Sequence, residues 1–269
     1  MIQVIISPAK QMDVRRDAFA PRGIPPFPDE TARAVEALRE IERADGPEGL
    51  QRLWGVSDKL LSENVERLHE FRPIMEAGEL DLPEAAVRVG PAIFSYIGIQ
   101  YRSMAPEVMD AAALDWLQGH LWVLSALYGC VRPFDAVQPY RLEMGARLAI
   151  EGGRNLYAFW GDRLARRICP DAGTALVNLA STEYSKAVLP RLEPDTKVVT
   201  CVFSSCIRNG KPVQKSTESK AARGSFVRWM AEHGVESIDE LARFDVGFTY
   251  DEDLSCSNGA RRTLVFMKS

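Results

Sequence analysis

The apolar positions of this chain form short runs near both ends and helically spaced series between them. Ile2–Ile6 is a run rich in β-branched residues, which is typical of a buried strand. Further strands are expected at 86–89, 198–203, 246–250 and 264–267. The Asn209-Gly210 pair predicts a hairpin turn after the strand at 198–203, with the return strand beginning at Val213.

Helical spacing of apolar residues predicts helices at 29–44, 114–127, 158–168 and 219–233, and another between Ser57 and Pro73. Asp29 is the expected N-cap of the helix at 29–44, and Ser57 is the expected N-cap of the helix that ends before Pro73. Ser237-x-x-Glu240 has the pattern of a capping box, which predicts one more short helix.

Strands at both ends with helices between them favour an α+β fold, in which one mixed β-sheet is flanked by helices. Strands and helices do not alternate regularly enough for a doubly wound fold. The proline-rich connector at 21–28 is too short and too apolar for a domain linker. Residues 1–269 are therefore expected to form a single compact domain.

Composition and charge narrow the function classes. The net charge of −4 excludes a uniformly basic nucleic-acid coat, so a nucleic-acid role needs a local basic patch. The chain has no apolar run of the roughly 18 residues that would cross a membrane, and its start does not look like a signal peptide. The five scattered cysteines lack CxxC spacing, which indicates a reducing compartment, so we expect a cytoplasmic protein with no membrane partner.

Several common chemistries have no motif in this sequence. His69, His120 and His233 lie far apart, so no metal site is expected, and His120 on an apolar helix face is interpreted as a core residue. There is no phosphate-binding or dinucleotide-binding glycine loop, and no G-x-S-x-G elbow of a serine hydrolase. No cofactor is expected.

A polar loop, Ser7-Pro8-Ala9-Lys10, follows the first strand directly. Open sheets usually place ligands at the carboxyl ends of their strands, and Lys10 offers a compact positive charge for an anion. The alternative is a strand end with a solvated lysine.

Two more segments combine polar and aromatic residues. The irregular stretch at 138–145 contains Tyr140, Arg141 and Glu143, and such loops tend to carry function, although Arg141 and Glu143 could simply form a structural ion pair. The stretch at 177–184 ends an apolar strand with Asn178, Ser181 and Glu183, which either face the same cleft as Ser7 and Lys10 or cap a helix. The aromatic residues at 156–160 are interpreted as core.

The stretch 197–228 is strongly basic. Its only acidic residue is Glu218, which leaves a local charge of +6 in a chain of net charge −4 and favours an anion-binding patch. Its cations are Lys197, Arg208, Lys211, Lys215, Lys220, Arg223 and Arg228.

Together these segments resemble the YaaA family of peroxide stress proteins over the full length. The matching residues are Ile6-Ser7-Pro8-Ala9-Lys10, Asp13, Ser125, Leu127-Tyr128-Gly129, Arg132-Pro133, Asp135, Gln138-Pro139-Tyr140-Arg141-Leu142-Glu143-Met144-Gly145, Leu156-Tyr157, Phe159-Trp160-Gly161-Asp162, Asn178-Leu179-Ala180-Ser181, Glu183-Tyr184, Lys220, Ala222-Arg223-Gly224 and Ser257-Asn258-Gly259. The sequence departs from the family at Gln11-Met12, where Thr-Leu is usual, and at Ala126, where glycine is common.

The resemblance implies a cytoplasmic protein with a fold of its own type that limits damage from hydrogen peroxide and is associated with lower free iron. It also implies DNA binding, through a positively charged cleft and a helix-hairpin-helix element that would grip phosphates without reading sequence. We place that element at 125–132. The expected DNA-binding residues are Tyr128, Gly129, Arg132, Lys215, Lys220, Arg223 and Arg228.

Three hypotheses follow. The first is a DNA-binding protein of the oxidative stress response, with double-stranded or distorted DNA as partner. The second is an enzyme acting on a nucleotide or nucleobase, with Lys10, Glu143 and Glu183 as catalytic candidates. The third, direct iron sequestration, lacks a ligand cluster. The expected cleft for a nucleotide-like anion comprises Ser7, Lys10, Tyr140, Arg141, Asn178, Ser181, Lys220 and Arg223, and it predicts that Lys10 lies near Arg141, Asn178 and Arg223.

Overall fold

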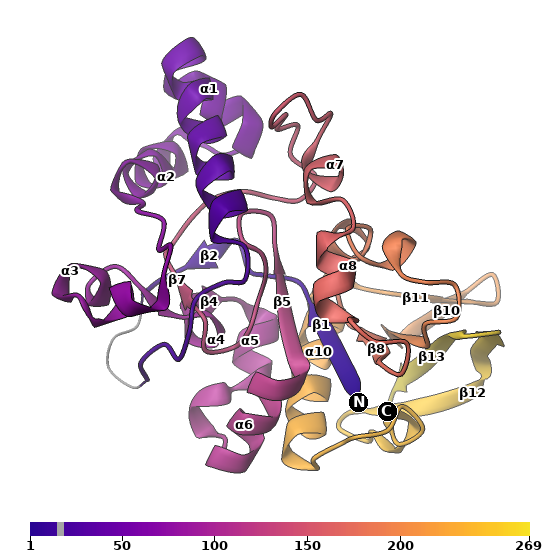
Figure 1. Cartoon of the computed structure of the whole chain (residues 1–269). Helices are drawn as coiled ribbons and strands as arrows, with labels where there is room; N and C mark the ends of the chain where they lie inside the picture. Colours follow the sequence, from indigo (N-terminus) through magenta and orange to yellow (C-terminus); the bar gives the residue numbers. More distant parts are fainter. Residues whose placement is uncertain (15–18) are drawn as a thin grey trace.

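The computed structural model describes residues 1–14 and 19–269, and Figure 1 shows how their elements are arranged. The strands are β1 Ile2–Ile6, β2 Gln11–Met12, β3 Gly90–Pro91, β4 Tyr96–Ile97, β5 Leu121–Ser125, β6 Gly129–Val131, β7 Ala136–Val137, β8 Ala175–Asn178, β9 Val198–Ser204, β10 Cys206–Arg208, β11 Lys211–Val213, β12 Phe248–Asn258 and β13 Arg261–Lys268. The α-helices are α1 Pro28–Trp54, α2 Asp58–Glu70, α3 Pro83–Ala86, α4 Ala92–Ser95, α5 Ile99–Met104, α6 Ala111–His120, α7 Leu156–Trp160, α8 Arg163–Ile168, α9 Thr182–Ser185 and α10 Ser216–Glu232. Short 3₁₀ turns lie at Ala77–Asp81, Pro106–Val108, Leu189–Arg191 and Leu241–Arg243.

The centre of the fold is a mixed sheet. In the described part of the chain, seven strands form it in the order β12-β13-β9-β8-β1-β5-β6. The strands from β13 to β5 run parallel, while β12 and β6 are antiparallel edge strands. Each residue of β1 is buried, because the strand lies between β8 and β5 and helices cover both faces of the sheet. The predicted α+β class, with a mixed sheet flanked by helices, is confirmed.

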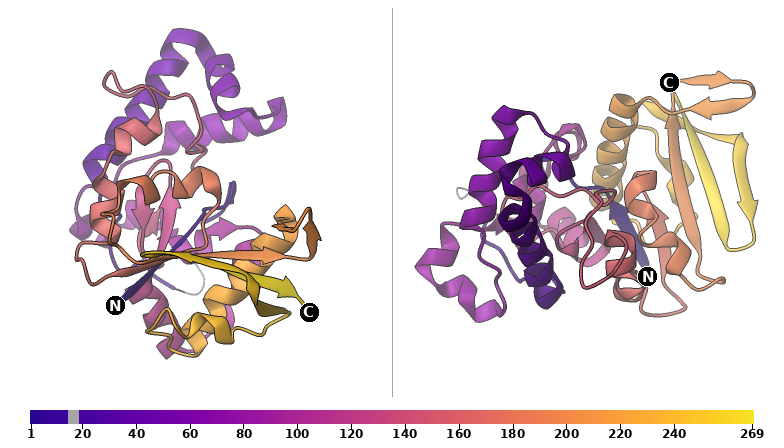
Figure 2. Two further views of the ribbon diagram at one scale, coloured as in Figure 1. Left: turned by 90° about the vertical axis from the view of Figure 1, so that its right-hand side faces the viewer. Right: turned by 90° about the horizontal axis from the view of Figure 1, so that it is seen from above.

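Helices cover both faces of this sheet. Figures 1 and 2 show α8 on one face and α10 on the other. α10 packs against α5, α6 and β9, with Ala222, Phe226 and Met230 buried as the helical spacing predicted. Phe203 of β9 contacts the Phe226 ring edge-on at 5.5 Å, which places an aromatic core between α10 and the sheet.

The helices α1 and α2 form an arm that projects beyond the ends toward which β1 and β5 run (Figure 1). The backbone of α1 departs from helical geometry at Gly46, where the sequence predicted the helix to end, and the helix resumes as far as Trp54. Its N-cap is Phe27, two residues before the predicted Asp29. Ser57 is the N-cap of α2, as predicted, although its side chain makes no capping hydrogen bond.

The predicted helix at 114–127 is wrong in its second half. The helix α6 ends at His120 and the chain continues as β5, whose five residues are all buried. Periodicity alone cannot separate a buried strand from a buried helix segment, because neither has a polar face. This correction also removes the helix-hairpin-helix placed at 125–132, because β5 and β6 form an antiparallel β-hairpin there, with Ser125 opposite Gly129.

Smaller differences concern turns and element ends. The expected strand at 86–89 is instead the end of α3 and a turn, and the expected helix at 158–168 is divided into α7 and α8 at Gly161. The hairpin turn at Asn209-Gly210 is confirmed, since both residues have positive φ and Arg208 pairs with Lys211 across it. The return strand begins at Lys211 and ends at Val213, the residue at which it was expected to begin. The two C-terminal strands are longer than predicted.

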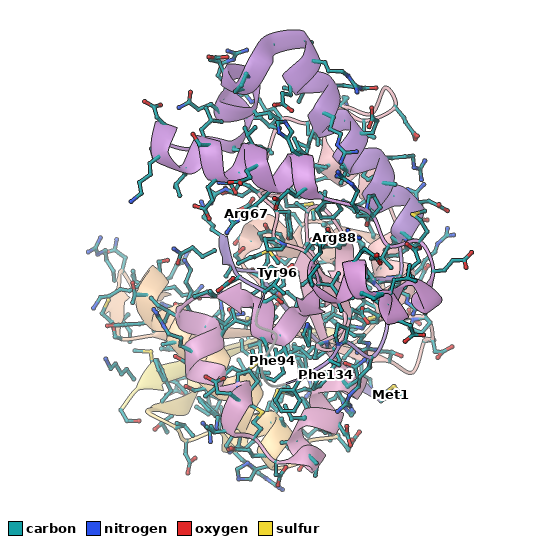
Figure 3. The ribbon with its side chains drawn as sticks, turned by 90° about the vertical axis from the view of Figure 1, so that its left-hand side faces the viewer. Met1, Arg67, Arg88, Phe94, Tyr96 and Phe134 are labelled. Carbon is teal, nitrogen blue, oxygen red and sulfur yellow. The ribbon has the colours of Figure 1, made fainter. Side chains whose placement is uncertain are left out.

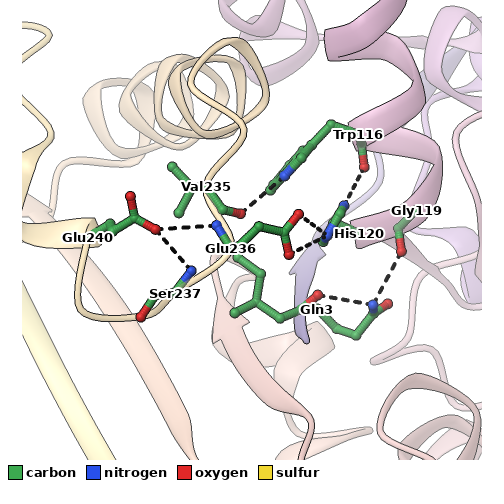
Figure 4. Close-up of polar contacts among 9 residues, drawn as sticks. Gln3, Trp116, Gly119, His120, Val235, Glu236, Ser237 and Glu240 are labelled. Atoms are coloured by element: carbon green, nitrogen blue, oxygen red, sulfur yellow. Dashed lines mark hydrogen bonds and ion pairs between the residues drawn. The ribbon is translucent and has the colours of Figure 1, made fainter.

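Near the start of β1, a polar network joins α6 to the segment that follows α10 (Figure 4). His120 stacks on Trp116 with ring centroids 4.4 Å apart, and its Nε2 lies 3.2 Å from a carboxylate oxygen of Glu236. Trp116 donates to the carbonyl of Val235. Glu240 accepts the N–H of Ser237, but only a 3₁₀ turn follows instead of the predicted short helix. These contacts hold the amino end of the sheet, opposite the candidate site.

Candidate functional site

The site begins at the carboxyl ends of β1 and β8, which are adjacent parallel strands. From β1 the chain goes on to β5 on one side, while from β8 it goes on to β9 on the other side. In open sheets of parallel strands, ligands bind where successive connections diverge in this way. Ile5 pairs with Asn178, so the loops that follow both strands start at the same level.

Two serines link these loops. The Ser7 hydroxyl accepts the backbone N–H of Ser181 at 2.8 Å and donates to the Ser181 hydroxyl at 3.1 Å. The Ser7 carbonyl accepts hydrogen bonds from Gln100 at 3.2 Å and from the hydroxyl of Tyr101 at 3.0 Å. The predicted proximity of Ser7 and Ser181 is therefore present. Gln100 and Tyr101 were missed, because nothing in their local sequence distinguishes them from other helix residues.

Lys10, Glu143 and Arg141 form an ion cluster. One oxygen of Glu143, Oε1, lies 3.0 Å from Lys10 Nζ and accepts a hydrogen bond from Arg141 at 2.7 Å. Lys10 is largely exposed, at 68 % for its side chain, whereas the Arg141 side chain is only 12 % exposed. The carboxylate therefore separates two cations that would otherwise repel each other, and the ion pair considered for Arg141 and Glu143 exists.

Glu183 is held near this cluster through the same loop. Its Oε1 accepts the N–H of Gly145 at 2.8 Å, and its backbone carbonyl accepts the hydroxyl of Tyr157 at 3.0 Å. A Cβ at Gly145 would lie 3.2 Å from that carboxylate oxygen, so a larger residue would crowd the contact. The two carboxylates named as catalytic candidates thus belong to one loop assembly that spans 140–145 and 181–184.

Tyr140 and Asn178 have internal partners. The Tyr140 hydroxyl lies 2.7 Å from Ser125 Oγ and 3.2 Å from the Tyr96 hydroxyl, and burial raises the pKa of this phenol. Asn178 contacts Thr200 with its amide nitrogen and accepts from Ala180 with its oxygen. Both side chains are buried, so they shape the site from below.

The segment Ala222-Arg223-Gly224 connects α10 to the serine pair. A Cβ at Gly224 would lie 2.0 Å from the carbonyl oxygen of Gln100, so this close approach of α10 to α5 requires glycine. The same Gln100 donates to Ser7. Arg223 is half-buried, burial lowers the pKa of its guanidinium, and it donates to Gln214 at 3.3 Å. Two cations form neither a hydrogen bond nor an ion pair with each other, so the expected proximity of Arg223 to Lys10 stays a prediction.

The basic stretch divides into separate parts in the fold. Lys197 precedes β9 at the amino ends of the parallel strands, opposite the candidate site, and Arg228 pairs with Glu232 at 2.8 Å. Lys215 lies 3.7 Å from Glu218. The remaining cations are Arg208, Lys211, Lys220 and Arg223, for which the described residues supply no carboxylate partner within 4.0 Å. We call these four residues the hairpin–helix surface.

Three residues expected to contact DNA have packing roles instead. Tyr128 and Gly129 are buried. Arg132 lies over the Trp122 ring at 3.7 Å and donates to the Leu121 carbonyl, and burial lowers its pKa to about 10. The physical reason is the β-hairpin, which inserts this segment into the core where a helix-hairpin-helix would expose it.

The described residues show neither a metal-binding group nor a membrane-spanning helix. No group of three or more His, Cys, Asp or Glu among them is arranged to hold a metal ion. None of their helices is both long and apolar enough to cross a bilayer.

Comparisons with known proteins relate this chain to one family. Residues 2–254 match a family model described as peroxide stress protein YaaA. A UPF0246 protein of Pediococcus pentosaceus is 40% identical over 269 residues, which cover 100% of this chain and 98% of that protein. Similar relatives occur in Lactiplantibacillus plantarum, at 41% over 258 residues (96% and 97% covered), and in Laribacter hongkongensis, at 40% over 274 residues (98% of each).

Proposed function

Because the chain belongs to the YaaA family of peroxide stress proteins, we propose that it acts in the oxidative stress response by binding DNA through the hairpin–helix surface. The observation that carries the proposal is the pairing of Arg208 directly with Lys211 beside the exposed Asn209-Gly210 turn. Like charges opposite each other destabilise a strand pair, and neither cation has a carboxylate partner among the described residues. An oxyanion between them would remove the repulsion.

Two cations on α10 extend this argument. Lys220 and Arg223 are three residues apart, hence neighbours on the helix surface. The buried Nε of Arg223 has no acceptor within residues 1–14 and 19–269. Its contact with Gln214, directly after β11, ties the helix to the base of the hairpin. Successive backbone phosphates are a fitting partner for cations spread over two such elements.

This mode of binding is independent of base sequence, because it needs no helix or strand in a groove. Bound protein would shield duplex or distorted DNA from peroxide damage. We propose that lower free iron, where it accompanies the oxidative stress response, is an indirect effect of that response in the cell.

The test is a titration of a labelled 20-base-pair duplex at several sodium chloride concentrations. Four phosphate contacts predict a log–log salt slope of roughly −3 to −4, with nearly equal affinity for two unrelated sequences. Binding that does not depend on salt, or no binding at low salt, contradicts the proposal.

A second candidate is an enzyme that acts on a nucleotide or nucleobase. It is favoured by the serine pair at the diverging β1 and β8 connections, with the ion cluster and the Glu183 carboxylate close by. In this reading Glu183 or Glu143 is the acid or base. Stoichiometric binding of a mononucleotide that Glu183→Gln abolishes, without effect on the duplex titration, would favour this candidate over the first.

A further inference from the structure

The asparagines of this chain differ in the residue that follows them. They are Asn64, Asn155, Asn178, Asn209 and Asn258, and glycine follows only the last two. The backbone nitrogen of the next residue can attack an asparagine side chain, and it does so most readily where that residue is glycine, because glycine has no Cβ to block the approach. Asn209-Gly210 joins β10 to β11, while Asn258 ends β12 and Gly259 begins the turn to β13.

The three remaining asparagines are held by hydrogen bonds and precede larger residues. Asn64 donates to the Leu60 carbonyl at 2.6 Å and accepts from Arg67 at 3.4 Å, and Figure 3 shows Arg67 beneath α2. Asn155 caps α7, and Asn178 is buried with its side-chain amide hydrogen-bonded. Valine or leucine follows each of these three asparagines, and its side chain hinders the attack.

The two Asn-Gly turns differ in how firmly their strands are held. β10 and β11 have three residues each and form a two-stranded sheet of their own, in which Arg208 lies opposite Lys211. A hairpin of this kind is marginally stable, and like charges opposite each other weaken it further. By contrast, β12 and β13 have eleven and eight residues, and β13 also pairs with β9. The Ala260 carbonyl in that turn accepts the N–H of Val198 at 2.8 Å, which fixes the turn to β9. The Asn209 turn therefore opens more readily than the Asn258 turn.

The tip of the β10–β11 hairpin is accessible. Ser204 ties the base of the hairpin, because its hydroxyl contacts the carbonyls of Cys206 and Val213 at 2.8 and 2.7 Å. Beyond this base, residues 207–211 are exposed. A Cβ added at Gly210 would meet no atom within 4 Å, so the turn is open on that side. Solvent and the neighbouring backbone nitrogen therefore reach the Asn209 side chain when the tip opens.

We propose that Asn209 is a site of spontaneous deamidation, and that the reaction weakens DNA binding by the hairpin–helix surface. The backbone nitrogen of Gly210 loses its proton to solvent and forms a bond with the side-chain carbonyl carbon of Asn209. The bond from that carbon to the amide nitrogen breaks, and the nitrogen leaves as ammonia, which gives a succinimide ring. Water then opens the ring at either carbonyl, so the product at position 209 is aspartate or isoaspartate. The net reaction consumes one water, releases one ammonia and changes no oxidation state.

The product adds a negative charge beside two cations that lack a counter-charge. The new carboxylate lies in the turn that joins Arg208 to Lys211, for which the described residues supply no carboxylate partner. It neutralises them as Glu143 neutralises Lys10 and Arg141 in the ion cluster. DNA then gains less from replacing its counterions with these side chains. This consequence rests on the proposed DNA binding, whereas the reaction itself does not.

Peptide mapping by mass spectrometry tests the reaction in the full-length protein. The protein is incubated at mildly alkaline pH in ¹⁸O-labelled water, so that each carboxylate formed during the experiment carries the label. We expect Asn209 to convert several times faster than Asn258, and the other three asparagines to stay unchanged over the same period. Lys211→Glu turns the repulsion across the hairpin into attraction, so it should slow the conversion of Asn209 and leave that of Asn258 unchanged.

The duplex titration tests the consequence. Asn209→Asp supplies the charge of the product directly and should lower the magnitude of the DNA salt slope by about 0.9 for each cation that it neutralises. Asn258→Asp is the matched control, because its turn lies at the amino end of β9 whereas the hairpin follows the carboxyl end. This control should keep the slope of the unmodified protein.

Two outcomes would overturn the proposal. The first is conversion of Asn209 that is no faster than that of Asn258, and the second is an Asn209→Asp variant whose salt slope equals that of the unmodified protein. If the unmodified protein binds no duplex, the proposed function and the effect on DNA are both wrong, while the peptide map still decides whether Asn209 is a deamidation site.

Discussion

Two groups of cations lie near the carboxyl ends of the parallel strands, and they differ in how their charge is balanced. In the ion cluster, Lys10 and Arg141 share one carboxylate oxygen of Glu143. On the hairpin–helix surface, Arg208 and Lys211 oppose each other without a carboxylate partner in the described part of the chain. Whether a cation is available to a polyanion therefore depends on whether it already pairs with a carboxylate. The count of basic residues in a sequence does not reveal such pairing.

The largest effect is expected from neutralising the unpaired group. Arg208→Gln, Lys211→Gln and Lys220→Gln together should reduce the magnitude of the DNA salt slope by about three units and the affinity on the order of a hundredfold. The three side chains are exposed, so the melting temperature should hardly change. Fluorescence anisotropy at several salt concentrations measures the slope.

A matched control changes the net charge equally elsewhere. Arg43, Arg52 and Lys59 are exposed on the α1–α2 arm, which Figures 1 and 2 show away from the β10–β11 hairpin. Their replacement by glutamine should leave most of the salt slope intact. An equal loss in both triple variants would mean that total charge governs binding and that the comparison between surfaces is wrong.

Local sequence predicted the elements whose patterns are unambiguous. β1 followed from a run of β-branched residues, the β10–β11 turn from Asn209-Gly210, and α10 from its apolar spacing. The stretch at 121–125 was misassigned, because a fully buried strand has no polar face that would set its period. The same error affected the placement at 125–132 of the helix-hairpin-helix that the family resemblance implies, because that stretch is a β-hairpin.

The candidate site was predicted in part for a similar reason. Ser7 directly follows β1, and Ser181 lies in the loop that follows β8. The loops after adjacent parallel strands meet at one end of the sheet, which brings the two serines together. Gln100 and Tyr101 come from a segment with no distinctive motif, and only tertiary packing brings them to Ser7. The pairing state of Lys10 and Arg208 likewise depends on distant residues, so it could not be predicted from the chain alone.

An intermediate effect is expected from converting the balanced cluster into an unbalanced one. Glu143→Gln keeps a hydrogen-bond acceptor for Arg141 but removes the charge between it and Lys10. Because Arg141 is mostly buried, unfolding in urea should show a loss of about 1–2 kcal/mol. Added phosphate should restore part of that stability, whereas it should not affect the unmodified protein. An unchanged unfolding free energy would mean that solvent already balances both cations.

The smallest effect is expected from Lys10→Ala. The Lys10 side chain is largely exposed, and exposed ion pairs contribute about 0–1 kcal/mol, so stability should change by about 0.5 kcal/mol at most. Glu143 keeps its 2.7 Å contact with Arg141, which is far less exposed and remains as its counter-charge. Since Glu143 already neutralises Lys10, removal of this lysine should also leave the DNA salt slope almost unchanged. The single variant Lys211→Gln removes the same charge from an unpaired position and should lower the slope by about 0.9. Measured side by side, the two variants isolate the role of pairing from that of charge. Equal losses of slope would show that DNA reaches Lys10 despite Glu143 and would extend the DNA-binding surface to the ends of β1 and β8.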